Sequence, residues 1–389
     1  MFYSFPTIQT IDDVLPIIKD RSDFVVADKG AFTVINYVVE MNDTFPPVIV
    51  DAEDTDAAIR RECRGLIFCN KTRRIIRRPY HKFFNYGQKE EVLPGNVDLA
   101  KAHRVLEKLD GSLIAPFRDH TGKLWWGTKM VAESFHDVVS AFVVDKTHYE
   151  RFVNECHRYD MTPIFEYVAP TNRIVVNYQS PNLILTAIRE NETGEYVDYK
   201  TMKSAAAFHY IPCVRAFDFD DFAALESYID SLEDAEGVVV RFDNGHMVKL
   251  KGPWYVQIHK VKDRITYDRN IVEIILDENL DDLLPFLMED ERVRIMQFQT
   301  DFWSALGRLY HSVCNIFDTI QSQNMDRKTF ALGLATTLDS ATKALIFKHF
   351  DDTMGYTETV VNTVRKSLVH NGRYEELRSQ WFPEVRYNG

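Results

Sequence analysis

The spacing of apolar residues divides the chain into two parts of different character. In the first two thirds, short apolar runs alternate with turn-forming residues, a pattern typical of strands joined by hairpins. After about Lys262, apolar residues recur every three or four positions, as they do along one face of a helix. The pattern predicts an α+β fold, with an antiparallel-sheet domain over residues 1–262 and a smaller all-helical domain over 263–389.

Four pairs of apolar runs predict the hairpins of the first domain. Each pair flanks a short segment rich in Gly, Asn or Asp, residues that favour tight turns. The four turn segments are 28–30 within 24–39, 119–122 between 104–117 and 123–129, 191–194 between 183–189 and 195–199, and 243–245 between 236–242 and 246–251.

The helical part contains one long apolar stripe, which we expect to be buried in the core of that domain. Its members are Val293, Met296, Trp303, Leu306, Tyr310, Val313, Phe317 and Ile320. A further helix is expected over 340–349, and another from Thr357 to Asn371-Gly372, because Gly is common just after the end of a helix.

Charge argues against a general nucleic-acid clamp, whose binding domain is usually basic. The net charge of the 389 residues is −12, and each predicted domain carries half of it. One local basic run occurs within twelve residues and is either a patch for RNA or a solvated strand face. It consists of Lys71, Arg73, Arg74, Arg77, Arg78 and Lys82.

Cysteine usage and hydropathy indicate a cytosolic protein. The five cysteines are odd in number and no two have CxxC spacing, so reduced thiols are expected and a structural zinc site is not. The N-terminus lacks the basic and apolar regions of a signal peptide, and no run of about 18 apolar residues could span a bilayer. We therefore expect no membrane association and a cytoplasmic location, which would be the host cytoplasm for a viral protein.

The sharpest chemical signal is Lys108-Leu109-Asp110-Gly111-Ser112, directly after the apolar pair Val105-Leu106. One interpretation is a strand that ends in an Asp-Gly turn with a solvated lysine. The other is a nucleophilic lysine in a pocket. An amine attacks phosphorus only when it is unprotonated, a form that nearby cations and a metal favour. Gly111 would then let the backbone approach a nucleotide closely.

The hairpin around 243–245 supplies a second argument. With Asn244-Gly245 as a two-residue loop, Val240 would pair with Lys249 and Val238 with Lys251. Glu236, Lys249 and Lys251 would then share one face, because alternate residues do. A single glutamate does not neutralise two lysines, whereas a polyphosphate with a divalent metal would. The alternative is an edge strand with solvated lysines.

Three further segments carry candidate site residues, although each alone could be structural. Arg64 precedes an apolar strand, and Lys82 stands beside Phe83 and Phe84, a combination suited to phosphate or base contact. Glu166 lies in the apolar segment Phe165-Glu166-Tyr167-Val168, where a carboxylate needs a partner.

Taken in order, the segments RG, KFFN, KxDGS, FEYV, EGVV and KLK resemble the motifs of the covalent nucleotidyltransferases. The closest resemblance is to the first RNA ligase family, that of the tRNA-repair ligases of T-even phages, most specifically over residues 165–175 and 189–196. The resemblance runs from about Phe24 to Asp282. It is poor between Lys129 and Phe165, and diffuse in the helical remainder.

The resemblance implies a role for each matching position. Lys108 would be the adenylated lysine, Glu166 would contact the ribose, and Glu236 would act on metal-bound phosphates. The resemblance also implies nucleotide binding by Tyr37, Arg64, Lys82, Phe84, Lys129, Lys249 and Lys251, a metal ligand at Asp281, and site positions at Asp110, Gly111 and Tyr255.

The same resemblance implies an ATP-dependent RNA ligase that uses Mg²⁺, with Mn²⁺ as a substitute. Its substrates would be RNA ends carrying a 5′-phosphate and a 3′-hydroxyl, as in nicked tRNA, and no obligate protein partner is indicated. The helical domain would recognise a folded RNA shape.

Two other functions are compatible with parts of this pattern. DNA ligases and capping guanylyltransferases share the chemistry but usually add a β-barrel after the last lysine motif, and the helical pattern after Lys262 argues against both. A catalytically idle RNA-binding scaffold would keep the fold without the chemistry. Failure to become labelled by ATP would favour that reading.

Overall fold

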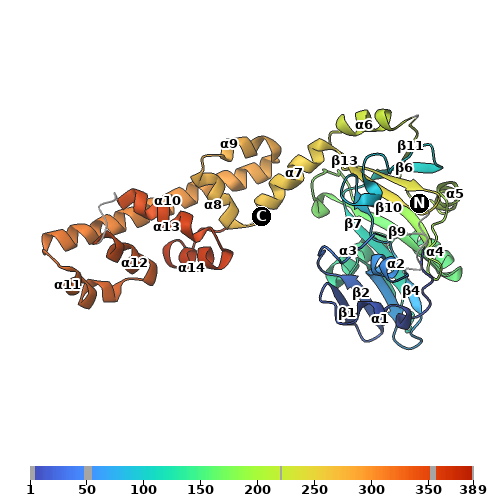
Figure 1. Cartoon of the computed structure of the whole chain (residues 1–389), viewed down its shortest axis with the longest axis horizontal. Coiled ribbons are helices and arrows are strands. Elements are labelled where there is room, and N and C mark those ends of the chain that lie inside the picture. The colour runs from blue at the N-terminus through green and yellow to red at the C-terminus, as the bar shows by residue number, and fades with distance from the viewer. Residues whose placement is uncertain (1–4, 48–54, 220, 351–355, 388–389) are drawn as a thin grey trace. The chain divides into compact units, whose positions relative to one another are not determined.

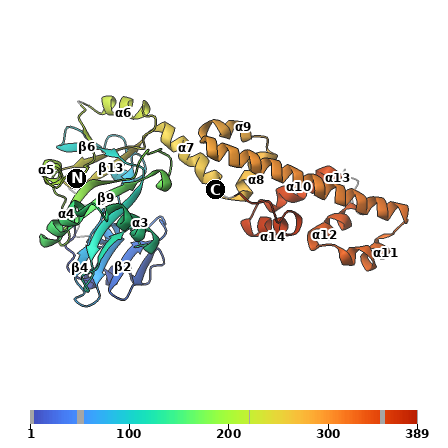
Figure 2. The same ribbon diagram turned by 180° about the vertical axis from the view of Figure 1, so that it is seen from behind.

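The computed structural model describes residues 5–47, 55–219, 221–350 and 356–387. The chain forms two compact units, Met1–Val256 and Gln257–Gly389. The first unit is rich in strands and the second is helical, so the fold is α+β (Figures 1 and 2). The predicted boundary after residue 262 and the observed one after Val256 both fall within α7 (Pro253–Arg264).

The described residues of the first unit form three sheets, and nearly all strand pairs in them are antiparallel. The first sheet has the order β1 (Phe24–Asp28), β2 (Phe32–Tyr37), β3 (Arg64–Cys69) and β4 (Ile75–Arg77). The second has the order β10 (Asn182–Glu190), β9 (Met161–Val168), β7 (Ser112–Arg118) and β8 (Leu124–Gly127). The third has the order β11 (Ala216–Phe217), β6 (His103–Lys108), β12 (Gly237–Phe242), β13 (Met247–Lys251) and β5 (Phe84–Asn85).

Helices of the first unit connect and cover these sheets (Figure 1). They are α1 (Leu15–Ile18), α2 (Thr55–Glu62), α3 (Glu133–Val143), α4 (Thr147–Arg158), α5 (Tyr199–Phe208) and α6 (Phe222–Asp230).

Three of the four predicted hairpins are confirmed. β1 pairs with β2, β7 with β8, and β12 with β13, each in antiparallel register. The fourth is confirmed only as a short ladder. Arg189 bridges Tyr196, and hydrogen bonds run from the Glu190 amide to the Glu195 carbonyl and from the Val197 amide to the Ile188 carbonyl. The second strand is shorter than predicted, because Asp198 caps α5, which begins at Tyr199, by accepting a hydrogen bond from the Thr201 amide.

The predicted register of the β12–β13 hairpin is wrong by one residue. Val239, not Val240, pairs with Lys249, and Gly237, not Val238, pairs with Lys251. The loop has three residues, Asp243–Gly245, closed by a hydrogen bond from the Phe242 amide to the His246 carbonyl. Gly245 provides the positive φ of 85° that such a loop requires.

The basic run at 71–82 does not form one exposed patch. Arg77 and Arg78 are completely buried. Arg77 donates to five backbone carbonyls, those of Gly65, Ala115, Gly127, Thr128 and Lys129. Arg78 and Arg189 both pair with buried Glu62, and these cations outweigh the effect of burial and lower the pKa of Glu62 to about 2.

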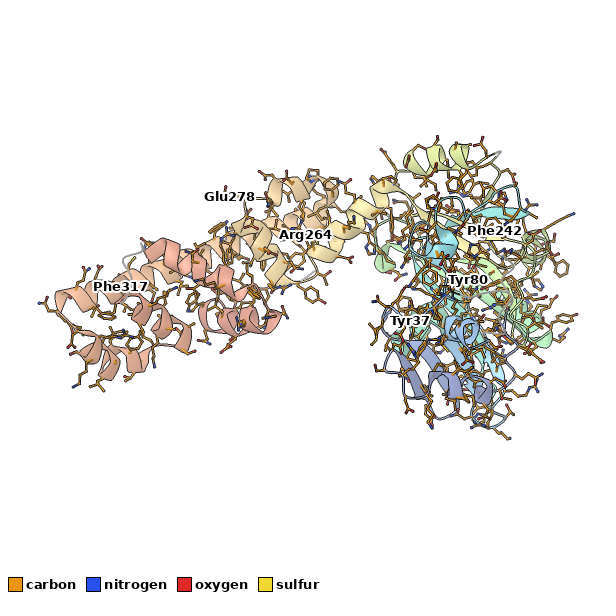
Figure 3. All side chains as sticks on the ribbon, in the orientation of Figure 1. Tyr37, Tyr80, Phe242, Arg264, Glu278 and Phe317 are labelled. Atoms are coloured by element: carbon orange, nitrogen blue, oxygen red, sulfur yellow. The ribbon has the colours of Figure 1, made fainter. Side chains whose placement is uncertain are left out.

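The second unit has one hydrophobic core built on the 34-residue helix α10 (Glu289–Ser322). Phe317, labelled in Figure 3, is one of the buried residues of that helix. The other helices of this unit are α8 (Asp268–Leu276), α9 (Leu280–Leu283), α11 (Arg327–Leu332), α12 (Ser340–His349), α13 (Tyr356–Ser367) and α14 (Asn371–Trp381).

The predicted core stripe of α10 is confirmed in its second half and wrong in its first. Leu306, Val313, Phe317 and Ile320 are buried, whereas Val293, Met296 and Trp303 are between 43% and 57% exposed. The core face of the first half consists of Ile295, Phe298 and Phe302 instead. Two apolar stripes run along this half, and spacing alone did not distinguish them.

The last predicted helix is two helices. α13 ends at Ser367, and Asn371-Gly372 starts α14, so the glycine lies in a first turn and is not a C-terminal signal. The prediction over 340–349 is confirmed by α12.

The five cysteines are free thiols. None of the described helices combines the length and the apolarity needed to cross a membrane.

Candidate active site

A cavity of about 380 Å³ lies against one face of the β6–β12–β13 sheet. Antiparallel partners share a face, so the register places Lys108, Gly237 and Lys251 in one row and Leu106, Val239 and Lys249 in the next. The opposite face, with Val105, Val238, Val240, Val248 and Leu250, is packed into a hydrophobic core. Because successive side chains of each strand point to opposite faces, one face of the sheet packs in the core and the other lines the cavity.

Glu236 joins two lysines at the first of these rows. Its carboxylate accepts from Lys108 Nζ at 2.5 Å and from Lys251 Nζ at 3.0 Å. Glu236 itself is only 4% exposed, so the amine of Lys108 is held at a fixed point in the cavity wall. The structure therefore brings together the three residues that the hairpin argument linked, although by another register.

Gly237 makes this geometry possible. Its φ is +146°, and a Cβ added there would lie 2.0 Å from the carbonyl oxygen of Leu250. Only glycine fits this position, and the resulting turn lets Glu236 reach the lysines although it lies outside the register of the strand.

Arg64, Lys82, Lys129 and Lys249 form a cationic group around the same cavity. The Nζ atoms of Lys82 and Lys129 lie 5.1 Å and 5.5 Å from the centre of the Tyr37 ring. Nη1 of Arg64 is buried and has no hydrogen-bond partner among the described residues. Lys82 is paired with Glu40 at 2.6 Å. The Arg64 guanidinium bonds the Tyr37 side chain but keeps this Nη1 donor unused, and a donor of that kind among several lysines is the arrangement expected for an anion site.

The charge state of this group follows from burial and crowding. Burial, then the cations Arg64, Lys108, Lys82 and Lys251, hold the pKa of Lys249 well below its ordinary value. Burial and Arg64 likewise lower the pKa of Lys129. Burial would raise the pKa of Tyr37, but Lys82, Arg64 and Lys129 outweigh it and lower that pKa. An anionic ligand would relieve this repulsion.

Asp110 anchors the segment that follows Lys108. It is 2% exposed, and its carboxylate accepts from the amides of Val175 and Val176 at 2.7 Å and 2.8 Å and from the Tyr255 hydroxyl at 2.7 Å. Lys251 Nζ lies 4.9 Å from the centre of the Tyr255 ring. Asp110 and Tyr255 therefore hold the lysines in place from behind the cavity.

Gly111 is required for a reason other than the one the sequence suggested. A Cβ there would lie 2.4 Å from the backbone oxygen of Tyr167, so glycine permits close approach of β9. Ser112 donates to Asn172 at 3.2 Å, and Asn172 donates to the same Tyr167 oxygen at 2.9 Å. This packing fixes where Glu166, on β9, enters the cavity.

Glu166 lines the cavity. Burial raises its pKa to about 7, and Glu236 and Asp110 add to the shift against the opposing effect of Lys108 and Arg64. A carboxyl group with a pKa near neutrality inside a cavity is a candidate functional group.

Two sequence-predicted residues lie elsewhere. Phe84 is 1% exposed within the hydrophobic core, and its neighbour Phe83 lines the cavity. Asp281 is an exposed residue of α9 in the second unit.

Several lining residues were not identified as site residues from the sequence. They are Tyr80, Leu106, Thr128, Thr186, Val214, Val239, Arg241 and Met247. Val239 closes the EGVV segment, and alternation along each strand from Lys108 and Lys249 would have identified Leu106 and Met247 whatever the register. Figure 3 labels Tyr80 and Tyr37, which both belong to the first unit.

Comparison with known proteins agrees with this geometry. Residues 62–255, which include all the cavity-lining residues, match a family described as RNA ligase. The match lies wholly within the first unit. RNA ligase 1 of bacteriophage TS2126 is 27% identical over 284 residues, covering 69% of this chain and 68% of its own. A Thermovibrio ammonificans protein, provisionally named an RNA ligase, is 24% identical over 331 residues, covering 81% of this chain and 83% of its own.

Among solved structures, an archaeal ATP-dependent RNA ligase aligns over 73% of this chain and 75% of its own. The identity is 14% and the TM-score 0.46, a likeness too distant to bear on function.

The carboxylates of this cavity are compatible with a magnesium ion. Among the described residues, no three His, Cys, Asp or Glu side chains form a metal cage. Mg²⁺ is usually held by one or two carboxylates together with substrate phosphates, and does not need such a cage. Glu166, which lines the cavity, and Glu236, which bonds the cavity-lining Lys108, are carboxylates that could serve.

The raised pKa of Glu166 gives a pH prediction for nucleotide binding. Below pH 7 the group is a neutral acid, and above it a carboxylate that can accept from ribose hydroxyls. We expect ATP to bind the Lys108→Ala variant roughly tenfold more tightly at pH 8 than at pH 6. The midpoint of the change in ATP affinity should lie at or slightly above pH 7, because the variant lacks the Lys108 cation, which lowers the pKa of Glu166.

Titration calorimetry across this range measures the effect without interference from the lysine's own chemistry. The matched control is the Lys108→Ala, Glu166→Gln double variant, for which the affinity should be flat with pH. Equal pH dependence in both proteins would show that another group is responsible.

Proposed function

We propose that this chain is an ATP-dependent RNA ligase that joins 5′-phosphate and 3′-hydroxyl RNA ends through an AMP covalently bound to Lys108. The observation that carries the proposal is the Lys108 amine, fixed by buried Glu236 beside a group of cations in a nucleotide-sized cavity. The match of residues 62–255 to a family described as RNA ligase supports the RNA substrate.

In the first step, the neutral amine of Lys108 attacks the α-phosphorus of ATP. The bond to the β-phosphate oxygen breaks, pyrophosphate leaves, and the amine loses its proton. The 5′-phosphate of RNA then takes the AMP from the lysine, and the 3′-hydroxyl of the other end displaces AMP. Reacting groups held in one cavity gain from proximity at each step.

The cavity residues divide into two groups by chemistry. Lys249, Lys251 and Arg64 supply positive charge for the phosphates, with Lys82 and Lys129 beside them. Leu106, Val239 and Phe83 supply apolar and aromatic surface for the nucleoside, and Glu166 can accept from its ribose. Bound Mg²⁺ would neutralise phosphate charge and stabilise the leaving group. Glu236, which bonds Lys108, would be one of its protein ligands.

The sealing assay tests this proposal directly. A 5′-phosphorylated single-stranded RNA, incubated with ATP and Mg²⁺, should be circularised or joined to a 3′-hydroxyl acceptor. The comparisons are a DNA strand of the same sequence in place of the RNA, and GTP in place of ATP. Preferential sealing of DNA would favour a DNA ligase, and labelling only by GTP would favour a guanylyltransferase.

We further propose tRNA repair as the role, with the helical second unit selecting the RNA. The catalytic residues other than Asp281 lie in the first unit, so a fragment should react with ATP without the remaining helices. Residues 263–389 are net acidic, so recognition of a folded RNA shape is more plausible than binding by bulk charge.

A fragment of residues 1–264 should label with ATP but lose preference for nicked tRNA over unstructured RNA. It ends with α7, which carries Tyr255. A second fragment ending at residue 290 retains Asp281 and tests its proposed metal role. Retained tRNA preference in either fragment, measured by competition sealing, would contradict this assignment of specificity.

A further inference from the structure

Arg241, a residue outside all the motifs discussed above, lines the cavity and also a second pocket beside Tyr196 and Asp198. Arg241 shares a sheet face with Val239 and Gly237, and Gly237 is the direct partner of Lys108. Arg241 lies four steps along the strand from Gly237, which is roughly 13 Å. This span suits a nucleotide whose α-phosphate is at Lys108 and whose base points toward Arg241.

Arg241 is buried and incompletely partnered. The residue is 7% exposed, and its Nη2 donates to the Val197 carbonyl at 3.2 Å. Its Nη1 is buried without a hydrogen-bond partner among the described residues. A buried N–H without an acceptor is unfavourable by enough to require an explanation.

The residue opposite Arg241 does not supply an acceptor. Arg241 pairs across the strands with Arg104, and like charges placed directly opposite repel each other. Arg104 is exposed and donates to the His103 carbonyl at 3.4 Å, and it does not line this cavity. The two arginines thus differ in the one property that matters, access to the cavity.

The surroundings of Arg241 identify the kind of acceptor. Tyr80, Thr186, Val214 and Met247 line the cavity with it, and none of them is a cation, unlike the lysines of the phosphate end. The Thr186 hydroxyl donates to the Ile164 carbonyl at 3.0 Å and also bonds the Tyr80 side chain, which leaves one lone pair of its oxygen to accept. A donor beside an acceptor, in apolar and aromatic surroundings, matches a ring nitrogen next to the exocyclic amine of adenine.

We propose that Arg241 is a base-recognition residue, whose Nη1 donates to a ring nitrogen of the adenine of ATP. The inference rests on the proposed ATP-dependent function, because it needs a nucleotide in this cavity. Arg241 contributes to selectivity for the base, and the lysines bind the phosphates.

The test compares the Michaelis constants for self-adenylation with ATP, 1-deaza-ATP and 7-deaza-ATP. Each analogue replaces one ring nitrogen by C–H. For the full-length unmodified chain, one of the two should have a KM raised roughly ten- to hundredfold, as expected for a lost hydrogen bond to a charged group, with kcat nearly unchanged. If both analogues react as ATP does, the inference is wrong, and this comparison needs no variant.

Arg241→Met should raise the KM for ATP by a similar factor and remove the difference between ATP and the sensitive analogue. The KM of Arg241→Lys, which keeps a charged donor, should lie between those of the unmodified chain and Arg241→Met. Arg104→Gln is the matched control, with the KM for every nucleotide unchanged. A variant that loses affinity for ATP and both analogues equally would show a structural role only, and thermal unfolding would reveal it.

Failure of this inference is distinguishable from failure of the proposed function. If the unmodified chain takes no label from any nucleotide, the proposed function is wrong. If it labels with ATP but ignores both ring substitutions, only the role of Arg241 is wrong.

Discussion

Replacing Lys108 by alanine is expected to abolish formation of the covalent AMP adduct and the sealing of 5′-phosphate RNA. The amine is the proposed nucleophile, and no other amine is fixed by Glu236 at the same point, since Lys251 bonds the other carboxylate oxygen. Pre-adenylated RNA should still be joined weakly, because the last step does not use the lysine as a nucleophile. Labelling with α-labelled ATP and gel analysis measures both outcomes.

The matched control is Lys101→Ala, which removes an exposed lysine from the segment leading to the same strand. It should label and seal at the unmodified rate. Covalent label on the Lys108→Ala protein would contradict the assignment.

Replacing Glu236 by alanine is expected to lower the adenylation rate by roughly 10²–10³ or more. The carboxylate holds Lys108 and Lys251 together, so its loss frees the nucleophile and leaves two close cations without a counter-charge. Any metal bound there would also lose a ligand. Single-turnover adenylation at saturating ATP is the measurement.

Two further variants separate charge from shape. Glu236→Gln keeps the size and one oxygen but not the charge, and should remain severely impaired. Glu233→Ala removes an exposed carboxylate nearby in the sequence and should have no effect. Near-normal rates for Glu236→Ala would mean that the ion pairs seen here are incidental to the chemistry.

Much of the site could be predicted because its residues recur at strand spacing. Lys249 and Lys251 share a face whatever the register, and the Asp-Asn-Gly turn located the hairpin that presents them. The register itself depended on whether the loop has two or three residues, which the same letters allow. Glu236 reached the lysines only because of the positive φ at Gly237, a backbone feature that a strand pattern does not predict.

Residues whose partners are distant in sequence were the hardest to interpret. Arg77 and Arg78 look like members of a solvated basic run, yet the carbonyls and the carboxylate that bury them come from segments up to 114 positions away. Arg241 could not be identified as a site residue for the same reason, because several of the residues that line the cavity with it come from distant segments. In α10, Trp303 and Phe302 are neighbours with equal apolarity, and only the packing of the second unit decides which of them is buried.

The central claim is that AMP becomes covalently attached to Lys108. Incubation of the full-length chain with α-labelled ATP and Mg²⁺, followed by denaturation, proteolysis and mass spectrometry, tests it most directly. We predict a single adduct, one AMP per chain, on the lysine of the peptide that contains Lys108-Leu109-Asp110-Gly111. An adduct on Lys249, Lys251 or any other residue, or no adduct that survives denaturation, would contradict the account.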